Sequence, residues 1–215
     1  MNIRVKNAGK RFNRDWIFRN FNYIFDFKNS YAITGPNGSG KSTLLQVIAG
    51  NIQASEGTID YSRDGLSFPE SESKKISEDF YSYLSIAAPY LETVEEMTAV
   101  EFLHFHTSFK PFITSVNIHQ ALEIVGLKNA ADKQIRFYSS GMKQRIKLAQ
   151  AIFSDTPVLL LDEPCTNLDA SGYELYRYLI NEYCNNKLII VSSNDINEYS
   201  FCNQQISITD YKPRS

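Results

Sequence analysis

The chain has 215 residues, of which 43% are apolar and 21% charged, and its formal net charge is −2 at pH 7. This length suffices for one sizeable domain with a hydrophobic core, and the balanced charge gives no basic excess that would indicate nucleic acid as the main partner. The three cysteines, Cys165, Cys184 and Cys202, form no CxxC pair, which is typical of reduced thiols rather than of a disulfide or metal framework.

The N-terminal residues MNIRVKNAGKRF are charged and have no apolar core, so they do not resemble a signal peptide. The longest apolar runs, VLLL and LIIV, have the length of buried strands and fall far short of the roughly 18 residues that a membrane span requires. The sequence therefore predicts a cytosolic chain, and a role at a membrane would depend on separate partners.

The N-terminal part of the chain predicts strands around a glycine-rich loop. Residues 3–5 and 21–27 alternate in the manner of strands at an antiparallel edge. Residues 30–34 form a β-prone run that leads into the loop, and residues 42–49 have helical spacing that stops at Gly50, a typical C-cap. Two further features are a strand at 57–61 and a polar, proline-containing surface loop at 67–79.

From about residue 92 to residue 153 the pattern becomes helical. Thr98 and Glu101 have the spacing of a capping box that begins one helix, residues 115–126 carry an apolar helical face, and a third helix is expected to start near Ser140.

Short apolar runs then alternate with helices again. They predict strands at 158–161, 187–191 and 205–209, and a helix from Ser171, which fits a capping box with Glu174. This order implies an α/β fold with a mostly parallel sheet buried on both faces, an antiparallel edge sheet and an inserted helical subdomain. We expect a single domain over residues 1–215, with its core at about 1–90 and 154–215 and the helical subdomain at about 91–153.

The stretch GPNGSGKS fits G-x-x-x-x-G-K-[ST] between a predicted strand and helix, the context that the pattern requires. Glycines let backbone N–H groups approach a polyphosphate, and the helix adds its positive N-terminal end. Lys41 is expected to reach the β- and γ-phosphates, and the Ser42 hydroxyl to ligate Mg²⁺. The predicted nucleotide-binding residues of this loop are Gly35, Pro36, Asn37, Gly38, Ser39, Gly40, Lys41, Ser42 and Thr43.

The stretch VLLLDEP places two carboxylates at the point where a buried strand ends, and ligands bind at that edge of open α/β sheets. Asp162 is the expected partner of Mg²⁺, usually through water, because this hard cation favours oxygen ligands. Glu163 projects differently and is a candidate to polarise an attacking water. Beside a matching phosphate loop, a purely solvated acidic turn is the less favoured interpretation.

Several motifs in a fixed order resemble one known family. Residues 138–145, YSSGMKQR, are similar to the signature LSGGQ with its Q-R tail, and TNLD, ending in Asp169, resembles a D-loop. Phe12 stands where that family has an aromatic residue that stacks on adenine, and Trp16 is a second candidate. Together with the phosphate loop and the carboxylate pair, these motifs cover nearly the whole chain and resemble the nucleotide-binding domain of ATP-binding-cassette (ABC) proteins.

The resemblance implies a head-to-tail dimer that encloses two ATP·Mg²⁺. A Ser-Gly run that opens a helix makes an anion site, and in the family it faces the γ-phosphate held by the other subunit. Ser139 and Gly141 keep the important positions, whereas Ser140 replaces a glycine. The partner is thus a second copy or a related cassette.

Two positions depart from the family pattern. Ala88 occupies the position of a glutamine that senses Mg²⁺, with Glu92 or Glu95 close enough to substitute. Asn194 stands where the family usually has a histidine, and the three histidines of the chain all fall in the helical block. Asn194 can donate a hydrogen bond to a γ-phosphate but cannot carry a proton. Because Glu163 is kept, slow hydrolysis is expected rather than none.

Three functions follow from these observations. The favoured one is the ATP-hydrolysing subunit of a transporter, peripherally associated with the inner face of a membrane and driving a separately encoded permease. The alternative is a soluble ATP-gated regulator of a non-membrane partner, although such members generally carry two cassettes or a coiled-coil insertion. A phosphate-loop kinase or GTPase is disfavoured because the sequence has no N-K-x-D pattern.

Overall fold

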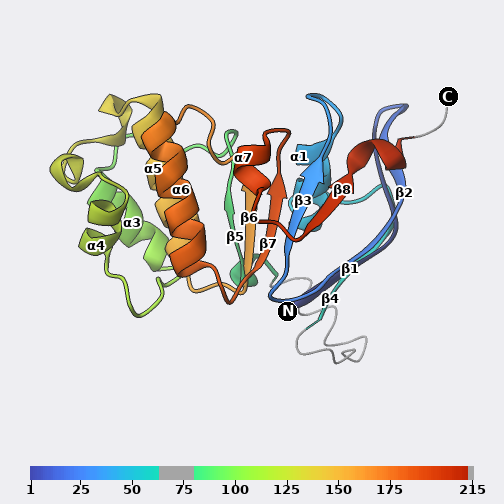
Figure 1. The fold of residues 1–215 in the computed structure, drawn as a ribbon, viewed down its shortest axis with the longest axis horizontal. Helices are drawn as coiled ribbons and strands as arrows, with labels where there is room; N and C mark the ends of the chain where they lie inside the picture. Colours follow the sequence, from blue (N-terminus) through green and yellow to red (C-terminus); the bar gives the residue numbers. More distant parts are fainter. Residues whose placement is uncertain (63–79, 213–215) are drawn as a thin grey trace.

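The computed structural model describes residues 1–62 and 80–212 (Figure 1). It has a three-stranded antiparallel sheet ordered β2-β1-β4 and a five-stranded parallel sheet ordered β5-β6-β7-β3-β8. The strands are β1 Asn2–Phe12, β2 Asp15–Phe25, β3 Ser30–Thr34, β4 Glu56–Ser62, β5 Leu84–Ala87, β6 Val158–Asp162, β7 Leu188–Ser192 and β8 Gln204–Ser207. The helices are α1 Lys41–Ile48, α3 Ala99–Thr107, α4 Ile118–Ile124, α5 Ser140–Phe153, α6 Ala170–Tyr183 and α7 Ile196–Tyr199, with 3₁₀ turns η1 Phe80–Tyr83, η2 Lys128–Ala130, η3 Ile135–Phe137 and η4 Ile208–Tyr211.

The parallel sheet is covered on both faces, which explains its uninterrupted apolar strands. Every residue of β6 and β7 is buried. Successive side chains point to opposite faces, so Leu159 and Leu161 join an apolar cluster with the helices α5 and α6, whereas Val158 and Leu160 pack towards α1 and the antiparallel sheet. The sequence-based prediction of an α/β fold is confirmed, with the parallel sheet positioned between two apolar clusters.

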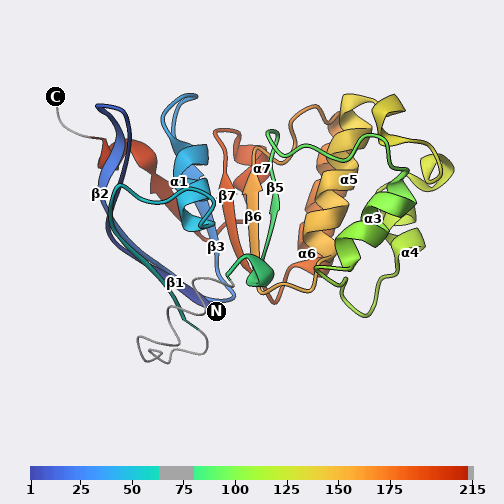
Figure 2. The same ribbon diagram turned by 180° about the vertical axis from the view of Figure 1, so that it is seen from behind.

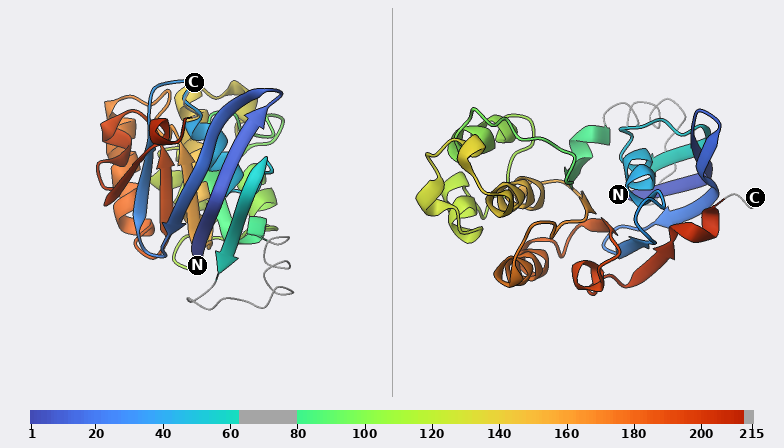
Figure 3. Two further views of the ribbon diagram at one scale, coloured as in Figure 1. Left: turned by 90° about the vertical axis from the view of Figure 1, so that its right-hand side faces the viewer. Right: turned by 90° about the horizontal axis from the view of Figure 1, so that it is seen from above.

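The antiparallel sheet lies across the end of the molecule away from α3 and α4 (Figure 3). Phe18, Phe21 and Phe25 of β2 are fully buried, and Phe25 contacts Tyr31 of β3 edge to face with ring centroids 5.0 Å apart. Such pairs add about 0.5–1.5 kcal/mol to the area they bury. These aromatic contacts fasten the antiparallel sheet to the strand that leads into the glycine-rich loop.

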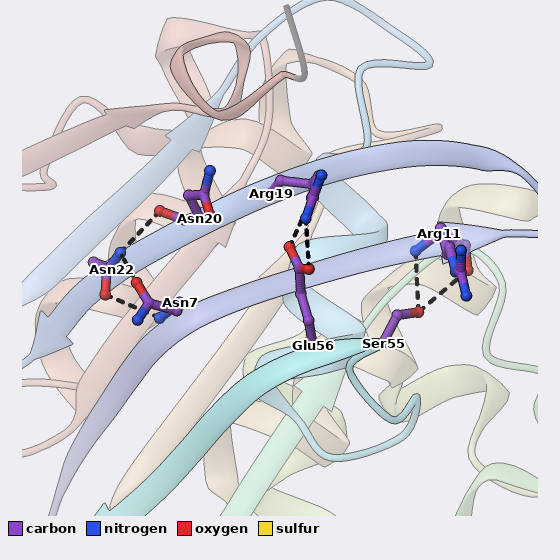
Figure 4. A network of polar contacts seen from close by, with 7 residues as sticks. All are labelled: Asn7, Arg11, Arg19, Asn20, Asn22, Ser55 and Glu56. Atoms are coloured by element: carbon purple, nitrogen blue, oxygen red, sulfur yellow. Dashed lines mark hydrogen bonds and ion pairs between the residues drawn. The ribbon is translucent and has the colours of Figure 1, made fainter.

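The outer face of the antiparallel sheet carries polar side chains that span all three strands (Figure 4). Arg19 of β2 donates two hydrogen bonds to Glu56 of β4, at 2.8 and 2.9 Å. The Glu56 side chain passes over Gly9 of the central strand, where an added Cβ would lie 2.5 Å from Oε1. Gly9 therefore leaves the space that this ion pair occupies.

The helices α3, α4 and α5 gather at the opposite end from the antiparallel sheet (Figure 2). Thr98 and Glu101 form the predicted capping box at α3, and α5 begins at Ser140 as expected. The apolar cluster of these helices continues onto β6, β7 and α6. The division into a core and a helical subdomain near residues 90 and 153 stays a prediction.

The helix α6 begins earlier than the sequence predicted. The sequence suggested that a helix begins at Ser171, but α6 begins at Ala170 and its N-cap is Asp169. Asp169 is the N-cap because its carboxylate accepts hydrogen bonds from the Gly172 N–H at 2.9 Å and from the Ser171 hydroxyl at 2.8 Å. The predicted surface loop at 67–79 lies outside the described residues.

Candidate nucleotide site

The glycine-rich loop joins β3 to α1 under close packing constraints. Gly40, the N-cap of α1, has φ 102°. It has no side chain that could accept hydrogen bonds from the first N–H groups of the helix. A Cβ at Gly40 would lie 2.3 Å from Ile17 Cγ2, and one at Gly35, which has φ 147°, would lie 2.7 Å from Ile208 Cγ2. Ile17 and Ile208 thus hold the loop from two sides, at positions that only glycine can occupy.

Lys41 is buried with its ammonium folded over the loop. Its Nζ donates to the carbonyl of Gly35 at 2.9 Å and to that of Pro36 at 3.3 Å. Neutral carbonyls are weaker partners for an ammonium than phosphate oxygens are. A bound polyphosphate would therefore draw this ammonium away from the loop carbonyls without requiring the backbone to move.

Asp162 ends β6 at the carboxyl edge of the parallel sheet and pairs with Ser192 of β7 in the ladder. It is 1% exposed, and among the residues that the structure describes, its Oδ1 has no hydrogen-bond partner. Burial raises the pKa of this carboxyl, whereas the hydroxyls of Ser192 and Ser42 and the charge of Lys41 oppose the rise. A buried carboxylate oxygen without a partner carries a desolvation penalty that a cation would offset.

The donor set around Asp162 fits Mg²⁺. The carboxylate of Asp162 and the hydroxyl of Ser42, which lies near it, are hard oxygen ligands of the kind that this cation prefers. Bound phosphate and water would supply the remaining ligands. The sequence-based pairing of Ser42 with Asp162 is thus compatible with the geometry.

Glu163 follows Asp162 in a backbone conformation that is rare for a residue with a side chain. Its φ is 43°, and its N–H donates to the Ser192 carbonyl at 2.9 Å. Left-handed conformations of non-glycine residues cost about 1–3 kcal/mol and cluster at functional sites. Because Glu163 lies in this turn, its side chain does not follow the alternation between the two sheet faces that the strand imposes on Asp162.

Asn194 reaches the glycine-rich loop from the end of β7. Its Nδ2 donates to Oδ1 of Asn37 at 3.1 Å. The three histidines lie in α3 and α4; burial lowers the pKa of His106 to about 4, and its Nε2 lies 2.7 Å from the Ser154 hydroxyl. Asn194 thus contacts the loop through Asn37, and its role towards a γ-phosphate stays a prediction.

The residues of the signature motif lie beside the D-loop rather than beside the glycine-rich loop. Ser139 is the N-cap of α5 and accepts from the Met142 N–H at 3.3 Å. A Cβ at Gly141 would lie 3.1 Å from the carbonyl oxygen of Asn167, so this helix start packs closely against the D-loop. Ser139 and Ser140 are exposed.

The strands β5, β6 and β7 lie between α5 and α1 in the view from above (Figure 3). Because the signature motif opens α5 and the glycine-rich loop precedes α1, the two motifs are on different sides of these strands within one chain. Arg145 of α5 approaches Asp169 at the start of α6 to 3.8 Å. The signature and the D-loop thus form one surface, separate from the phosphate loop of the same chain.

The tip of the β1–β2 hairpin carries both candidate aromatic residues. Trp16 has the guanidinium groups of Arg11 and Arg19 at 5.4 and 4.2 Å from its ring centroid. Phe12 is 47% exposed, with the ammonium of Lys10 at 5.0 Å from its ring. Because two cations already lie against Trp16, this arrangement favours Phe12 as the ring with a face open to a ligand.

Position 88, where the family has glutamine, is a fully buried alanine. Glu95 pairs with Lys143, and Glu92 lines a groove of about 500 Å³ together with Lys147. Sequence reasoning missed Tyr90, which is 42% exposed; partial desolvation and then the charge of Asp162 raise its pKa, and the Gln46 side chain opposes the rise. The signal available in the sequence was its position two residues after Ala88.

Comparisons with known proteins agree with these motifs. Residues 18–166 match a family model described as ABC transporter. The chain is 30% identical over 196 residues to the ABC transporter ATP-binding protein YybJ of Bacillus subtilis, covering 89% of this chain and 84% of that protein. It is also 30% identical over 196 residues to the cytochrome c biogenesis ATP-binding export protein CcmA of Agrobacterium fabrum, covering 90% of this chain and 88% of that protein.

Solved structures show the same fold. An ABC transporter ATP-binding protein from Pyrococcus furiosus superposes with a TM-score of 0.81 at 19% identity, covering 99% of this chain and all of that one. The dimeric bacterial cassette MJ0796 gives a TM-score of 0.76 at 23% identity, covering 96% and 94% of the two chains. None of the helices in the described part of the chain is long and apolar enough to cross a membrane.

Proposed function

We propose that this chain, which belongs to the ABC transporter family, binds and hydrolyses ATP with Mg²⁺ and thereby drives a separately encoded membrane permease. One observation carries the proposal. The glycine-rich loop with Lys41 lies at the same sheet edge as Asp162, a buried carboxylate with an oxygen left without a partner in the described structure. A nucleotide with its metal would satisfy the loop N–H groups, the lysine and the carboxylate together.

The binding roles follow from position. The ammonium of Lys41 and the backbone N–H groups of the loop, to which Pro36 contributes none, would hold the phosphates, and Ser42 and Asp162 would hold Mg²⁺. Phe12 stacks on the adenine ring. When bound, the metal would neutralise charge on the β- and γ-phosphates.

Hydrolysis rests on Glu163 and Asn194. Glu163 orients or activates a water for in-line attack on the γ-phosphorus, with the proton passing towards its carboxylate while the bond from the γ-phosphorus to the bridging oxygen breaks and ADP leaves with that oxygen. Asn194 turns its Nδ2 from Asn37 to a γ-phosphate oxygen, a hydrogen bond that carries no proton. A positioned acid–base group is typically worth about 10²–10⁴ in rate, so turnover is slow.

Two copies of the chain, or this chain and a related cassette, close head to tail around two nucleotides. Ser139, Ser140 and Gly141 of one copy meet the γ-phosphate bound by the other, and Asp169 lies in the same interface. The exposed position of the two serines and their separation from the phosphate loop of the same chain support this arrangement. The proposed closure is the step that does work on the partner.

The permease subunit is proposed to dock at the groove beside Ala88, which places the chain at the inner face of a membrane. This groove is lined by glutamates and lysines from the segment after β5 and from α5: Glu92, Glu95, Glu96, Lys143 and Lys147. Lys147 ties the two segments by donating to the carbonyl of Pro89 at 3.1 Å. The names of relatives, which include an export protein, support a transport role.

The proposal is tested by isolating the chain from native membranes in mild detergent and measuring ATP turnover of the complex. Co-isolation of a protein with several membrane spans, and a rate above that of the Glu163→Gln variant, are expected. Isolation of the chain with a partner that has no membrane span would instead favour the soluble regulator. A complex with no rate above the Glu163→Gln control would refute hydrolysis.

A further inference from the structure

The peptide group between Pro164 and Cys165 follows directly after Glu163 and is hydrogen-bonded at both of its polar atoms. Its N–H, on Cys165, donates to Oε1 of Glu198 at 2.8 Å. Its carbonyl, on Pro164, accepts from Nε2 of Gln144 at 2.6 Å. Because the described chain has no cis peptide bond, this N–H and this carbonyl point in opposite directions. Gln144 and Glu198 therefore hold the peptide from opposite sides.

Both of the side chains that hold this peptide are buried. Gln144 of α5 is 3% exposed, Glu198 of α7 is 4% exposed, and Cys165 is 1% exposed. The peptide lies beyond the end of β6, so side chains rather than a neighbouring strand supply its hydrogen-bond partners. Turning the peptide plane would break both bonds and leave buried polar groups unpaired, at about 1–3 kcal/mol each. The two side chains thus fix the orientation of the peptide.

The backbone is also fixed on the other side of Glu163. The N–H of Glu163 donates to the carbonyl of Ser192 at 2.9 Å, and its φ is 43°. Such strained conformations persist only where the surrounding structure determines them. Pro164 removes a further degree of freedom, because its ring sets φ. Hydrogen bonds to β7, α5 and α7 therefore determine the direction in which the Glu163 side chain leaves the backbone.

The helices that hold the peptide also carry other parts of the proposed site. Gln144 lies in the same helix as the signature residues, whose N-cap is Ser139. The helix α7 begins two residues after Asn194. Tyr176 of α6 fixes α7 separately, because its buried hydroxyl donates to the backbone carbonyl of Glu198 at 2.8 Å. The chain next to Glu163 is thus tied both to the signature helix and to the segment that follows Asn194.

We infer that Gln144 and Glu198 are positioning residues, which hold the Pro164–Cys165 peptide so that the carboxylate of Glu163 faces the attacking water. The inference rests on the proposed function and adds two residues to its hydrolytic step. Neither side chain touches the nucleotide, and both act through the backbone beside Glu163. A displacement of about 1 Å at a reacting centre can cost about 10²-fold in rate. Nucleotide binding depends on the glycine-rich loop and does not require these two bonds.

Variants that change the reach of each side chain test this role. Glu198→Asp keeps a carboxylate but draws it back from the Cys165 N–H, whereas Glu198→Gln keeps the length and an acceptor oxygen. In steady-state ATP turnover by the isolated complex, Glu198→Asp should lower kcat by about 10- to 100-fold and leave the KM for ATP unchanged. Glu198→Gln should retain most of the wild-type kcat. Gln144→Asn, which shortens the donor in the same way, should lower kcat as Glu198→Asp does.

Tyr176→Phe is the matched control, because it removes an equally buried hydrogen bond to Glu198 without touching the Pro164–Cys165 peptide; its kcat should equal that of the wild type. An Asn194→Ala background separates the two groups near α7. Glu198→Asp should cause the same fold loss of kcat in that background, because it acts through Glu163 and not through position 194.

The inference is overturned if a folded shortened variant, Glu198→Asp or Gln144→Asn, keeps the wild-type kcat. It is also overturned if Glu198→Gln or Tyr176→Phe loses as much kcat as Glu198→Asp, or if the loss disappears in the Asn194→Ala background. Because the shortened variants interrupt different bonds, either one decides the matter if the other fails to fold. A wild-type complex with no rate above that of Glu163→Gln would instead refute the proposed hydrolysis itself.

Discussion

The side-chain amide of Asn194 donates a hydrogen bond to Oδ1 of Asn37 at 3.1 Å, which joins the end of β7 to the glycine-rich loop across 157 positions of sequence. Asn37 is a loop residue that phosphate would approach, so Asn194 is already aimed at the place where a γ-phosphate would lie. Its geometry suits a sensor, but an amide cannot carry charge or a proton. This pair therefore offers a structural cause, open to test, for the slow turnover that is proposed.

Asn194→His is expected to raise the ATP turnover number by about 10-fold or more, because a positioned acid–base group is worth about 10²–10⁴ in rate. Steady-state phosphate release by the isolated complex gives the number. Asn194→Ala, which removes the hydrogen bond without adding a base, is the control and should lower turnover. Equal rates for the histidine variant and the wild type would show that position 194 does not limit hydrolysis.

Lys41→Ala should weaken ATP binding by about 10- to 150-fold, since a hydrogen bond to a charged group is worth about 1.5–3 kcal/mol. The native ammonium rests on the Gly35 and Pro36 carbonyls, so the substitution removes the phosphate partner and leaves two carbonyls near solvent. Calorimetric titration of ATP measures the effect. Lys143→Ala, which removes a lysine that pairs with Glu95 in the groove, should bind ATP normally, and near-normal affinity of Lys41→Ala would contradict the phosphate role.

Ser139→Arg should leave ATP binding by the single chain intact but abolish ATP-dependent dimerisation in a Glu163→Gln background. A bulky cation at the exposed start of α5 would occupy the space of the partner's γ-phosphate. Light scattering with and without ATP measures the dimer. Ser139→Ala separates the effect of bulk from that of lost bonds: it loses the N-cap bond to Met142, worth about 0.5–2 kcal/mol, and the proposed γ-phosphate contact, so it should weaken dimerisation without abolishing it. If Ser139→Arg dimerises at the same ATP concentrations as the protein with Ser139, the composite site is refuted.

The sequence predicted the parts of the site that are local patterns. The loop around Lys41, the carboxylates at the end of β6 and the capping box at α3 each depend on neighbours within a few residues, and all lie where expected. The predicted start of α6 was wrong because Asp169 and Ser171 are both residue types that suit an N-cap, and only the folded geometry decides between them.

The approach of Ser192 to Asp162 could not be predicted, because it depends on the register in which β6 and β7 pair. Pairings between segments so far apart in sequence leave little trace in residue pattern, since one-residue shifts keep the composition of each strand unchanged.

Asp162→Asn should stabilise the nucleotide-free protein against unfolding at pH 7 while removing the Mg²⁺ dependence of ATP binding. Burial raises the pKa of Asp162 in the folded state, so the charged form destabilises the fold. The Asp162 carboxyl therefore contributes most to the free energy of unfolding at pH values below its pKa in the unfolded state. That contribution is lost as the pH rises through its higher pKa in the folded state. The advantage of asparagine, about 1–3 kcal/mol for relieving a buried group without a partner, should be largest near pH 7 and shrink as pH falls towards 4. Urea unfolding at pH 7.5 and pH 5 measures this trend.

Asp195→Asn is the control with the opposite sign. Hydrogen bonds from the Asn197 backbone and the Tyr173 hydroxyl lower the pKa of Asp195, so its carboxylate stabilises the fold above its unfolded pKa, and this contribution is lost as pH falls through the folded value. Asp195→Asn should therefore be less stable than the wild type at pH 7.5, and the difference in their free energies of unfolding should become smaller at acidic pH. If both variants shift stability in the same direction at pH 7.5, the charge of Asp162 is not what destabilises the empty site. Opposite shifts would instead identify Asp162 as a carboxylate retained for its ligand at the expense of stability.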